Sequence, residues 1–219
     1  MSAQAHETPS PRPARSRLDP QQRQSMILDS TAAIVARDGV SALSMERIGR
    51  AAGISKSLVY NYFPSLTDLL RQLLQRELRA LRRLQAEAAG DARTFEGLVR
   101  AVTHVYLKYI EERGLIIERL QAEPSVSAIH DPTEYSRESA VAYLADVVVE
   151  HFDLPIEIAR VATEISFGLP AAAGARLLHG TMTRDALEDM TVTMILGCIT
   201  ELKRDHLARQ PLRSAEQVP

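Results

Sequence analysis

The chain has 219 residues, of which 45% are hydrophobic and 25% charged, a composition typical of a soluble globular protein with a core of its own. Its single cysteine, Cys198, cannot close an internal disulfide, and no apolar run reaches the roughly 18 residues of a membrane-spanning helix. These features argue against a disulfide-stapled protein and against a membrane protein. The N-terminus lacks the apolar stretch of a signal peptide, so we expect a cytoplasmic protein.

The formal net charge of −2 conceals an asymmetry along the chain. Residues 1–83 carry 13 Lys/Arg against 7 Asp/Glu, whereas residues 84–219 carry 13 against 21. A basic first third followed by an acidic remainder indicates that one end of the protein meets a polyanion. Chance drift in surface charge is the alternative explanation.

Helical periodicity dominates the chain between its two ends. Residues 1–19 are rich in Pro, Ser, Ala and Arg and are predicted to form a disordered basic arm, and residues 210–219 a flexible tail. The first helix is predicted over Pro20–Asp38, with Asp19 as its N-cap and Gly39 as its stop signal.

Two short helices are predicted next, over Ser44–Ala52 and Ser55–Phe63. Gly53 separates them, and glycine allows the positive φ that a sharp turn needs. Small residues such as Gly49 let the two helices approach closely. The arrangement is a candidate helix-turn-helix, although an ordinary corner between two helices has the same pattern.

Six further helices are predicted, which makes about nine in an all-α fold whose larger, C-terminal part is a helical bundle. They are expected over about residues 66–89, 91 or 94–114, 115–122, 134–152, 155–179 and 184–208, with a loop over 123–132. Pro170 is expected to kink its helix, because proline removes a backbone donor and clashes with the preceding turn.

The second short helix has two different faces. At about 100° per residue, Val59, Tyr62 and Phe63 fall on one side. The opposite side is small and polar with one aromatic ring, and consists of Lys56, Ser57, Tyr60 and Asn61. Such a face suits the major groove of DNA.

Each residue type on and around this face has a chemistry that fits DNA. Lys56 is able to neutralise a phosphate or reach a guanine, and Asn61 to pair bidentately with an adenine. Tyr60 is placed to reach the backbone or the bases. The Ser44 and Ser55 hydroxyls, at helix N-termini, suit phosphate oxygens, as does the Tyr62 hydroxyl.

A set of positions combines the glycine turn, a Tyr-x-Tyr-Phe ending and a following long helix in one register: Ser44, Ile48, Ala51–Gly53, Ile54–Ser55, Tyr60, Tyr62–Phe63 and Leu69. The pattern resembles the DNA-binding domain of TetR-family transcriptional regulators over roughly residues 20–80. The resemblance implies a homodimeric repressor of a pseudo-palindromic DNA site. Residues 81–209 would then form the ligand-binding and dimerisation domain.

Two positions depart from the family pattern. Ser57 stands where the family often has glycine, and Leu66 where it often has a lysine at the start of the next helix. The second departure removes one phosphate contact. Our hypothesis is that Arg23 or the basic arm, with Arg12, Arg15 and Arg17, compensates for it.

The resemblance also implies that the helices over about 155–179 and 184–207 form the dimer interface as a four-helix bundle. The stretch Gly168–Leu178 is rich in small residues and permits close helix approach. The last helix carries one apolar stripe, made of Leu187, Met190, Thr191, Met194, Cys198 and Leu202. Packing within one chain is the alternative use of both features.

A ligand cavity is expected among the helices at 94–113, 134–152 and 155–179, with the lower part of the 66–89 helix. Candidate lining residues are the polar and aromatic residues of these helices, namely His104, Tyr106, Tyr109, Tyr143, Glu164 and Phe167. Each has an ordinary core or surface role as its alternative. The mostly apolar surroundings favour a hydrophobic effector.

Catalytic and metal-binding patterns are missing from the sequence. It has no HExxH, CxxC, G-x-S-x-G, P-loop or GxGxxG motif, and its six histidines are dispersed. We therefore expect no enzyme, cofactor or metal, and we expect Cys198 to be a small buried hydrophobe rather than a redox sensor. The expected partners are double-stranded DNA, a small effector and a second copy of the chain. A helical small-molecule-binding protein with a vestigial helix-turn-helix is the alternative.

Overall fold

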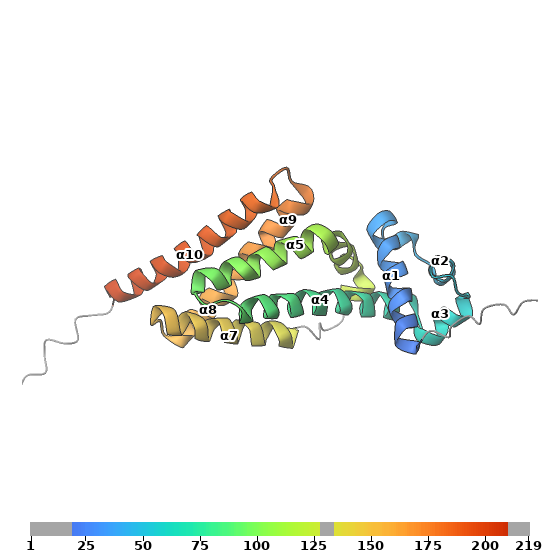
Figure 1. Ribbon diagram of the computed structural model, residues 1–219, viewed down its shortest axis with the longest axis horizontal. Coiled ribbons are helices and arrows are strands. Elements are labelled where there is room, and N and C mark those ends of the chain that lie inside the picture. The colour runs from blue at the N-terminus through green and yellow to red at the C-terminus, as the bar shows by residue number, and fades with distance from the viewer. Residues whose placement is uncertain (1–18, 128–133, 210–219) are drawn as a thin grey trace, which may run out of the picture.

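The computed structural model describes residues 19–127 and 134–209, and the predicted basic arm and C-terminal tail lie outside this range apart from Asp19 (Figure 1). The described part holds nine α-helices of seven residues or more, one four-residue helix and a short 3-10 helix, Val40–Ala42, without any strand. The predicted all-α fold is therefore confirmed. None of these helices is long and apolar enough to cross a membrane.

Three helices gather at one end of the molecule: α1 (Pro20–Asp38), α2 (Met45–Ala51) and α3 (Lys56–Tyr62) (Figure 1). The predicted bounds of α1 are confirmed, and local signals set them. The backbone N–H of Asp19 donates to Gln22 Oε1 at 3.3 Å at its start, and Gly39 turns the chain at its end with φ +83°.

The core of this end takes side chains from four successive helices. Ile27, Ile48, Val59 and Phe63 are fully buried, together with Leu69 at the start of α4 (Leu66–Gly90). The same cluster includes Ile116 and Leu120 of α5 (Phe95–Gln121). The small N-terminal helices therefore pack directly on the helices of the larger part.

The break predicted at Gly114, between helices over 94–114 and 115–122, was wrong, because α5 continues without interruption to Gln121. Gly114 is buried, and a Cβ there would lie 2.9 Å from Ile110 Cγ2 and 3.0 Å from Leu178 Cδ1. The glycine thus makes room for a neighbouring helix rather than ending its own. Thr94 caps α5, its Oγ1 accepting from the Gly97 N–H at 3.0 Å.

The single kinked helix predicted over 155–179 was also wrong, because the chain forms two helices, α8 (Ile156–Ser166) and α9 (Gly168–His179). Pro170 lies in the first turn of α9, where backbone N–H groups have no partner inside the helix. Proline is tolerated at that position, so one helix ends before it and α9 contains it without a kink.

The remaining helices complete the larger part. The short α6 (Pro124–Ser127) falls within the predicted loop, and α7 (Glu134–Phe152) and α10 (Arg184–Arg209) follow the predicted ranges. The helices α4 and α5 pack together, α7 packs on α8, and α10 runs along α5 and α9 (Figure 1).

Candidate nucleic-acid interface and ligand cavity

The turn between α2 and α3 is built on two glycines. Gly53 has φ +67°, which favours glycine, and the Ile54 N–H donates to the Gly49 carbonyl at 2.9 Å. A Cβ on Gly49 would lie 2.9 Å from the Ile54 carbonyl oxygen. Both glycines therefore fix the angle at which α3 leaves α2.

Hydroxyl caps begin both helices. Ser44 Oγ accepts from the Arg47 N–H at 3.1 Å, and Ser55 Oγ accepts from the Leu58 N–H at 3.2 Å. Both serines are exposed. A hydroxyl that accepts in a cap still has its own proton to donate, so both remain able to bond a phosphate oxygen.

The two faces of α3 lie as the periodicity predicts. Val59 and Phe63 are fully buried, and Tyr62 is half-buried against the same core. The outward side chains are all exposed, namely Lys56, Ser57, Tyr60 and Asn61, with Tyr60 at 47% of its surface. The predicted DNA-facing residues thus lie on α3 or at the N-termini of α2 and α3.

The outward face has few internal partners. Arg47 pairs with Asp38 and donates to the Ala42 carbonyl at 3.0 Å, and Arg50 pairs with Glu46 at 3.0 Å. In contrast, the side chains of Lys56, Tyr60 and Asn61 make no hydrogen bond or ion pair with the described residues. Their polar groups are available to an external partner.

A cavity of about 440 Å³ lies in the larger part, between α4, α5, α7, α8, α9 and α10. Its walls are mostly aliphatic, and include Leu81, Leu98, Val102, Val148, Ile195 and Ile199. Of the six lining residues predicted from the sequence, the structure places Tyr106 and Phe167 on this wall. The expected helices do surround it, and α10 joins them.

The other four predicted lining residues lie elsewhere. His104 is exposed and contacts Glu188 at 2.9 Å, and Tyr143 is 52% exposed. Glu164 is exposed and lies 3.6 Å from Arg160 one turn away on its own helix.

Tyr109, the fourth, donates to a carboxylate outside the cavity. Helical spacing shows which side chains share a face, but not which face meets the neighbouring helices, and this explains the misplacement of the four.

Sequence reasoning missed seven polar lining residues, namely Arg82 and Gln85 of α4, Thr103 and Gln121 of α5, Arg137 of α7, and Thr163 and Ser166 of α8. The only available signal was their position beside apolar residues in amphipathic helices. Long arginine side chains commonly cover apolar surface while their heads reach water, so that signal is weak.

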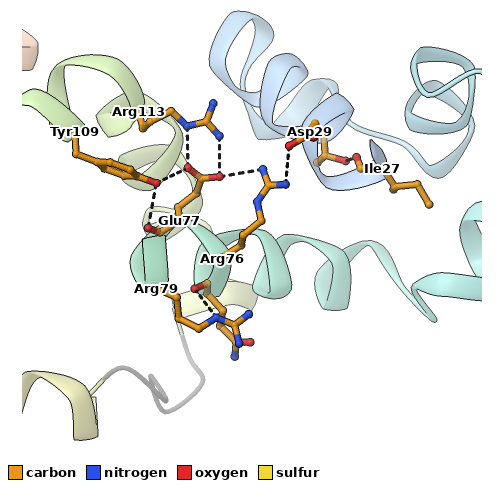
Figure 2. Close-up of polar contacts among 9 residues, drawn as sticks. Ile27, Asp29, Arg76, Glu77, Arg79, Tyr109 and Arg113 are labelled. Atoms are coloured by element: carbon orange, nitrogen blue, oxygen red, sulfur yellow. Dashed lines mark hydrogen bonds and ion pairs between the residues drawn. The ribbon is translucent and has the colours of Figure 1, made fainter. Parts of the chain in front are cut away.

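A buried carboxylate, Glu77 of α4, was also missed, and it joins three helices (Figure 2). Arg113 of α5 donates two bonds to it at 2.8 and 2.7 Å, and Tyr109 donates one at 3.0 Å. Arg76 donates to the same carboxylate at 3.1 Å, and it also donates to Asp29 of α1 at 2.6 Å. The Glu77 network therefore connects α1 to both α4 and α5.

The partners in the Glu77 network set its protonation. Burial alone would raise the pKa of Glu77, but the hydrogen bonds and charge of Arg113, with bonds from Tyr109 and Arg76, hold that pKa below its ordinary value. Burial and the neighbouring Glu77 charge raise the pKa of Tyr109 to about 12. At neutral pH the carboxylate is therefore ionised and the phenol is a donor.

A second contact ties α5 to α1. Arg119 donates to the backbone carbonyls of Val35 and Ala36 at 2.6 and 2.9 Å, in the last turn of α1. Cations at a helix C-terminus satisfy its unpaired carbonyls and complement its dipole. The position of α1 thus depends on α4 through Arg76 and on α5 through Arg119.

Comparison with known proteins agrees with this architecture. Residues 27–73 match the family model described as bacterial regulatory proteins, tetR family. A TetR-like transcriptional regulator from Rhodococcus sp. RHA1 superposes with a TM-score of 0.66 at 19% identity, over 84% of this chain and 99% of that one. The TetR-like regulator LfrR from Mycobacterium smegmatis, solved with proflavine, gives a TM-score of 0.59 at 22% identity, over 81% and 96%.

Among curated proteins, the nucleoid occlusion factor SlmA of Actinobacillus pleuropneumoniae is 24% identical over 125 residues. The match covers 52% of this chain and 62% of SlmA, less than two thirds of that relative's length. The fold, with a helix-turn-helix at one end, is that of these TetR-like transcriptional regulators. Residues 27–73 thus match the tetR family of bacterial regulatory proteins, and the described chain has the fold of TetR-like regulators over most of its length.

Proposed function

We propose that this protein is a homodimeric repressor that binds a pseudo-palindromic operator and is released by a small hydrophobic effector. The observation that carries the proposal is the outward face of α3. An aromatic ring, an amide and an ammonium group stand exposed there without internal partners, at Tyr60, Asn61 and Lys56. Their exposure gives them no packing role in the described chain, and all three fit the major groove.

In this proposal α3 reads the bases, and the groups around it hold phosphates. Asn61 pairs with an adenine, and Lys56 contacts a guanine or a phosphate. The Ser44, Ser55 and Tyr62 hydroxyls bind the DNA backbone. Residues 20–80 serve as the DNA-binding domain and residues 81–209 as the ligand-binding and dimerisation domain, with α4 shared between them.

Two apolar faces on α10 support a homodimer. One face points inward, with Leu187, Thr191, Ile195 and Ile199 buried in the described chain. A second face is exposed, with Met190 at 50% and Met194 at 46%. The single stripe predicted from the sequence therefore mixed residues of two faces.

Cys198 lies one turn beyond Met194, and it is exposed rather than buried as expected. The neighbouring α8 exposes Val161 at 54% and Ile165 at 70%. Packing of α8 and α10 against a second copy would bury all of these side chains, and a two-fold dimer matches the symmetry of a palindromic site.

The cavity is the proposed effector site. Its volume lies within the range of about 300–1,000 Å³ found for small-molecule pockets, and LfrR was solved with proflavine bound. An effector shifts the protein only by its differential affinity for two conformations. The Glu77 network and Arg119 give the cavity helices α4 and α5 a mechanical connection to α1.

Footprinting on the DNA upstream of the protein's own gene tests the proposal. We expect protection of a pseudo-palindrome whose half-sites are centred about 34 Å apart or a multiple of that, as a dimer with two reading helices requires. Protection that scrambled competitor DNA removes equally well would contradict the proposal. That outcome would favour the alternative, a cytoplasmic helical small-molecule-binding protein whose helix-turn-helix is vestigial.

A further inference from the structure

The charged residues among the described lining of the cavity all have one sign. Among the described lining residues, two are arginines, Arg82 on α4 and Arg137 on α7, and none is Asp, Glu or His. The rest of the wall is mainly aliphatic and aromatic. A mostly apolar site of low dielectric strengthens the attraction of a guanidinium for an anion and its repulsion of a cation.

The two arginines occupy different depths. Arg82 is half-buried, and its Nε atom is shielded from solvent. Arg137 is exposed, with its guanidinium 6.0 Å from the centroid of the Phe167 ring that also lines the cavity. The two lining arginines therefore differ in their exposure to solvent.

The cavity wall also carries a buried hydroxyl group. Thr163 on α8 is 5% exposed, and its hydroxyl has no hydrogen-bond partner among the described residues. The nearby Ser166 hydroxyl, in contrast, donates to the Ala162 carbonyl at 2.7 Å. Burying an unpaired hydroxyl is unfavourable, so a ligand oxygen beside Thr163 would relieve that cost.

From these three groups we propose that the effector is an amphipathic anion, with an apolar body and a carboxylate head. The body lies among the aliphatic side chains, the carboxylate is held by Arg82 and Arg137, and the Thr163 hydroxyl donates to a ligand oxygen. Charge-assisted bonds of guanidinium to carboxylate are among the strongest polar contacts available. This assignment rests on the proposed function, because it names the chemical class of the effector.

Calorimetric titration of the full chain with three ten-carbon probes tests the assignment. The probes are decanoate, decan-1-ol and decyltrimethylammonium, each kept below the concentration at which it forms micelles or a separate phase. They share the apolar body and differ in the charge of the head. We expect decanoate to bind at least about tenfold more tightly than the alcohol and the cation, as a charge-assisted bond predicts.

Arg82→Gln is the principal variant, and Arg83→Gln is its matched control. Arg83 is the next residue on α4, its side chain is 72% exposed and lies 3.8 Å from Glu87, and it does not line the cavity. Both variants remove one positive charge from the same helix. We expect Arg82→Gln to weaken decanoate about tenfold and to leave decan-1-ol unchanged, and Arg83→Gln to change neither.

Arg137→Gln, at the more exposed arginine, provides a second variant if Arg82→Gln lowers the melting temperature too far for titration. Any one of four results would overturn the assignment. The three probes bind with equal affinity, the cation binds most tightly, no probe binds, or both arginine variants keep the wild-type affinity for decanoate. The titration contains no DNA. A failure here with operator binding intact rejects only the effector class, whereas failure of the footprint rejects the repressor.

Discussion

Tyr60 lies on α3 and Phe63 is the C-cap of that helix, and their environments are opposite, one 47% exposed and the other fully buried. Phe63→Ala leaves a void in the core shared by α1, α2, α3 and α4, and we expect it to cost about 3–5 kcal/mol. Tyr60→Ala removes an exposed ring, and we expect it to lower the free energy of unfolding by less than about 0.5 kcal/mol. Chemical denaturation of both variants checks the assignment, and similar costs would show that the two faces are wrong.

Glu77 gives a second prediction at this scale, because Glu77→Gln removes the charge from a buried carboxylate that accepts four bonds. Hydrogen bonds to charged groups contribute about 1.5–3 kcal/mol each, so we expect a loss of at least that size at pH 7. The exposed Glu46→Gln, on α2, is the control and should change stability little.

The pH dependence of the Glu77→Gln effect follows from the sign of the pKa shift. The folded-state pKa of Glu77 is below its ordinary value of 4.5, so its ionised form stabilises the protein above that pH. The stabilisation is lost as the pH falls through the folded pKa. Denaturation at a series of pH values should therefore show the difference from wild type shrinking below pH 4.5, and a constant difference would contradict this role.

At the scale of single elements, the angle between α2 and α3 depends on Gly49. Gly49→Ala pushes a methyl group against the Ile54 carbonyl, and overpacking of this kind costs about 1–3 kcal/mol. Gly90→Ala, at the end of α4, meets no atom within 4 Å and is the control. We expect Gly49→Ala alone to destabilise the protein and weaken DNA binding, as melting curves and mobility-shift titrations would show.

Elements were predictable from the sequence where local chemistry sets them. The bounds of α1 follow from Asp19 and Gly39, and the α2–α3 turn follows from Gly53, all within a few residues of the feature they control. The continuity of α5 through Gly114 was not predictable, because it depends on Leu178, far away in the sequence. A glycine that ends a helix and a glycine that makes room for a neighbouring helix look the same in a sequence.

The functional residues divide in the same way. The outward face of α3 was predictable, because a short helix that follows a well-defined turn buries only one of its sides. The cavity wall was not, because it needs the relative rotation of six helices, and only Tyr106 and Phe167 of the six candidates lie on it. Glu77 carried an unused signal, since it falls on the stripe of Leu70, Leu73 and Leu81.

At the scale of the whole molecule, the second apolar face of α10 predicts the assembly. Met194→Lys places a charge in the proposed interface, and we expect it to convert a dimer into a monomer in analytical ultracentrifugation. Leu115→Lys puts the same charge on an exposed apolar residue of α5, at 40% exposure, and should leave the dimer intact. A dimer that persists in Met194→Lys would place the interface elsewhere.

The central claim is that the outward face of α3 reads DNA sequence, and the ratio of affinities for the footprinted site and for a scrambled fragment tests it most directly. Fluorescence anisotropy at one fixed salt concentration measures both affinities for the wild type and for the Tyr60→Ala/Asn61→Ala variant. We predict that the wild-type ratio exceeds about 10³ and that the double variant loses most of it while keeping its melting temperature. A folded double variant that retains the wild-type ratio would contradict the claim.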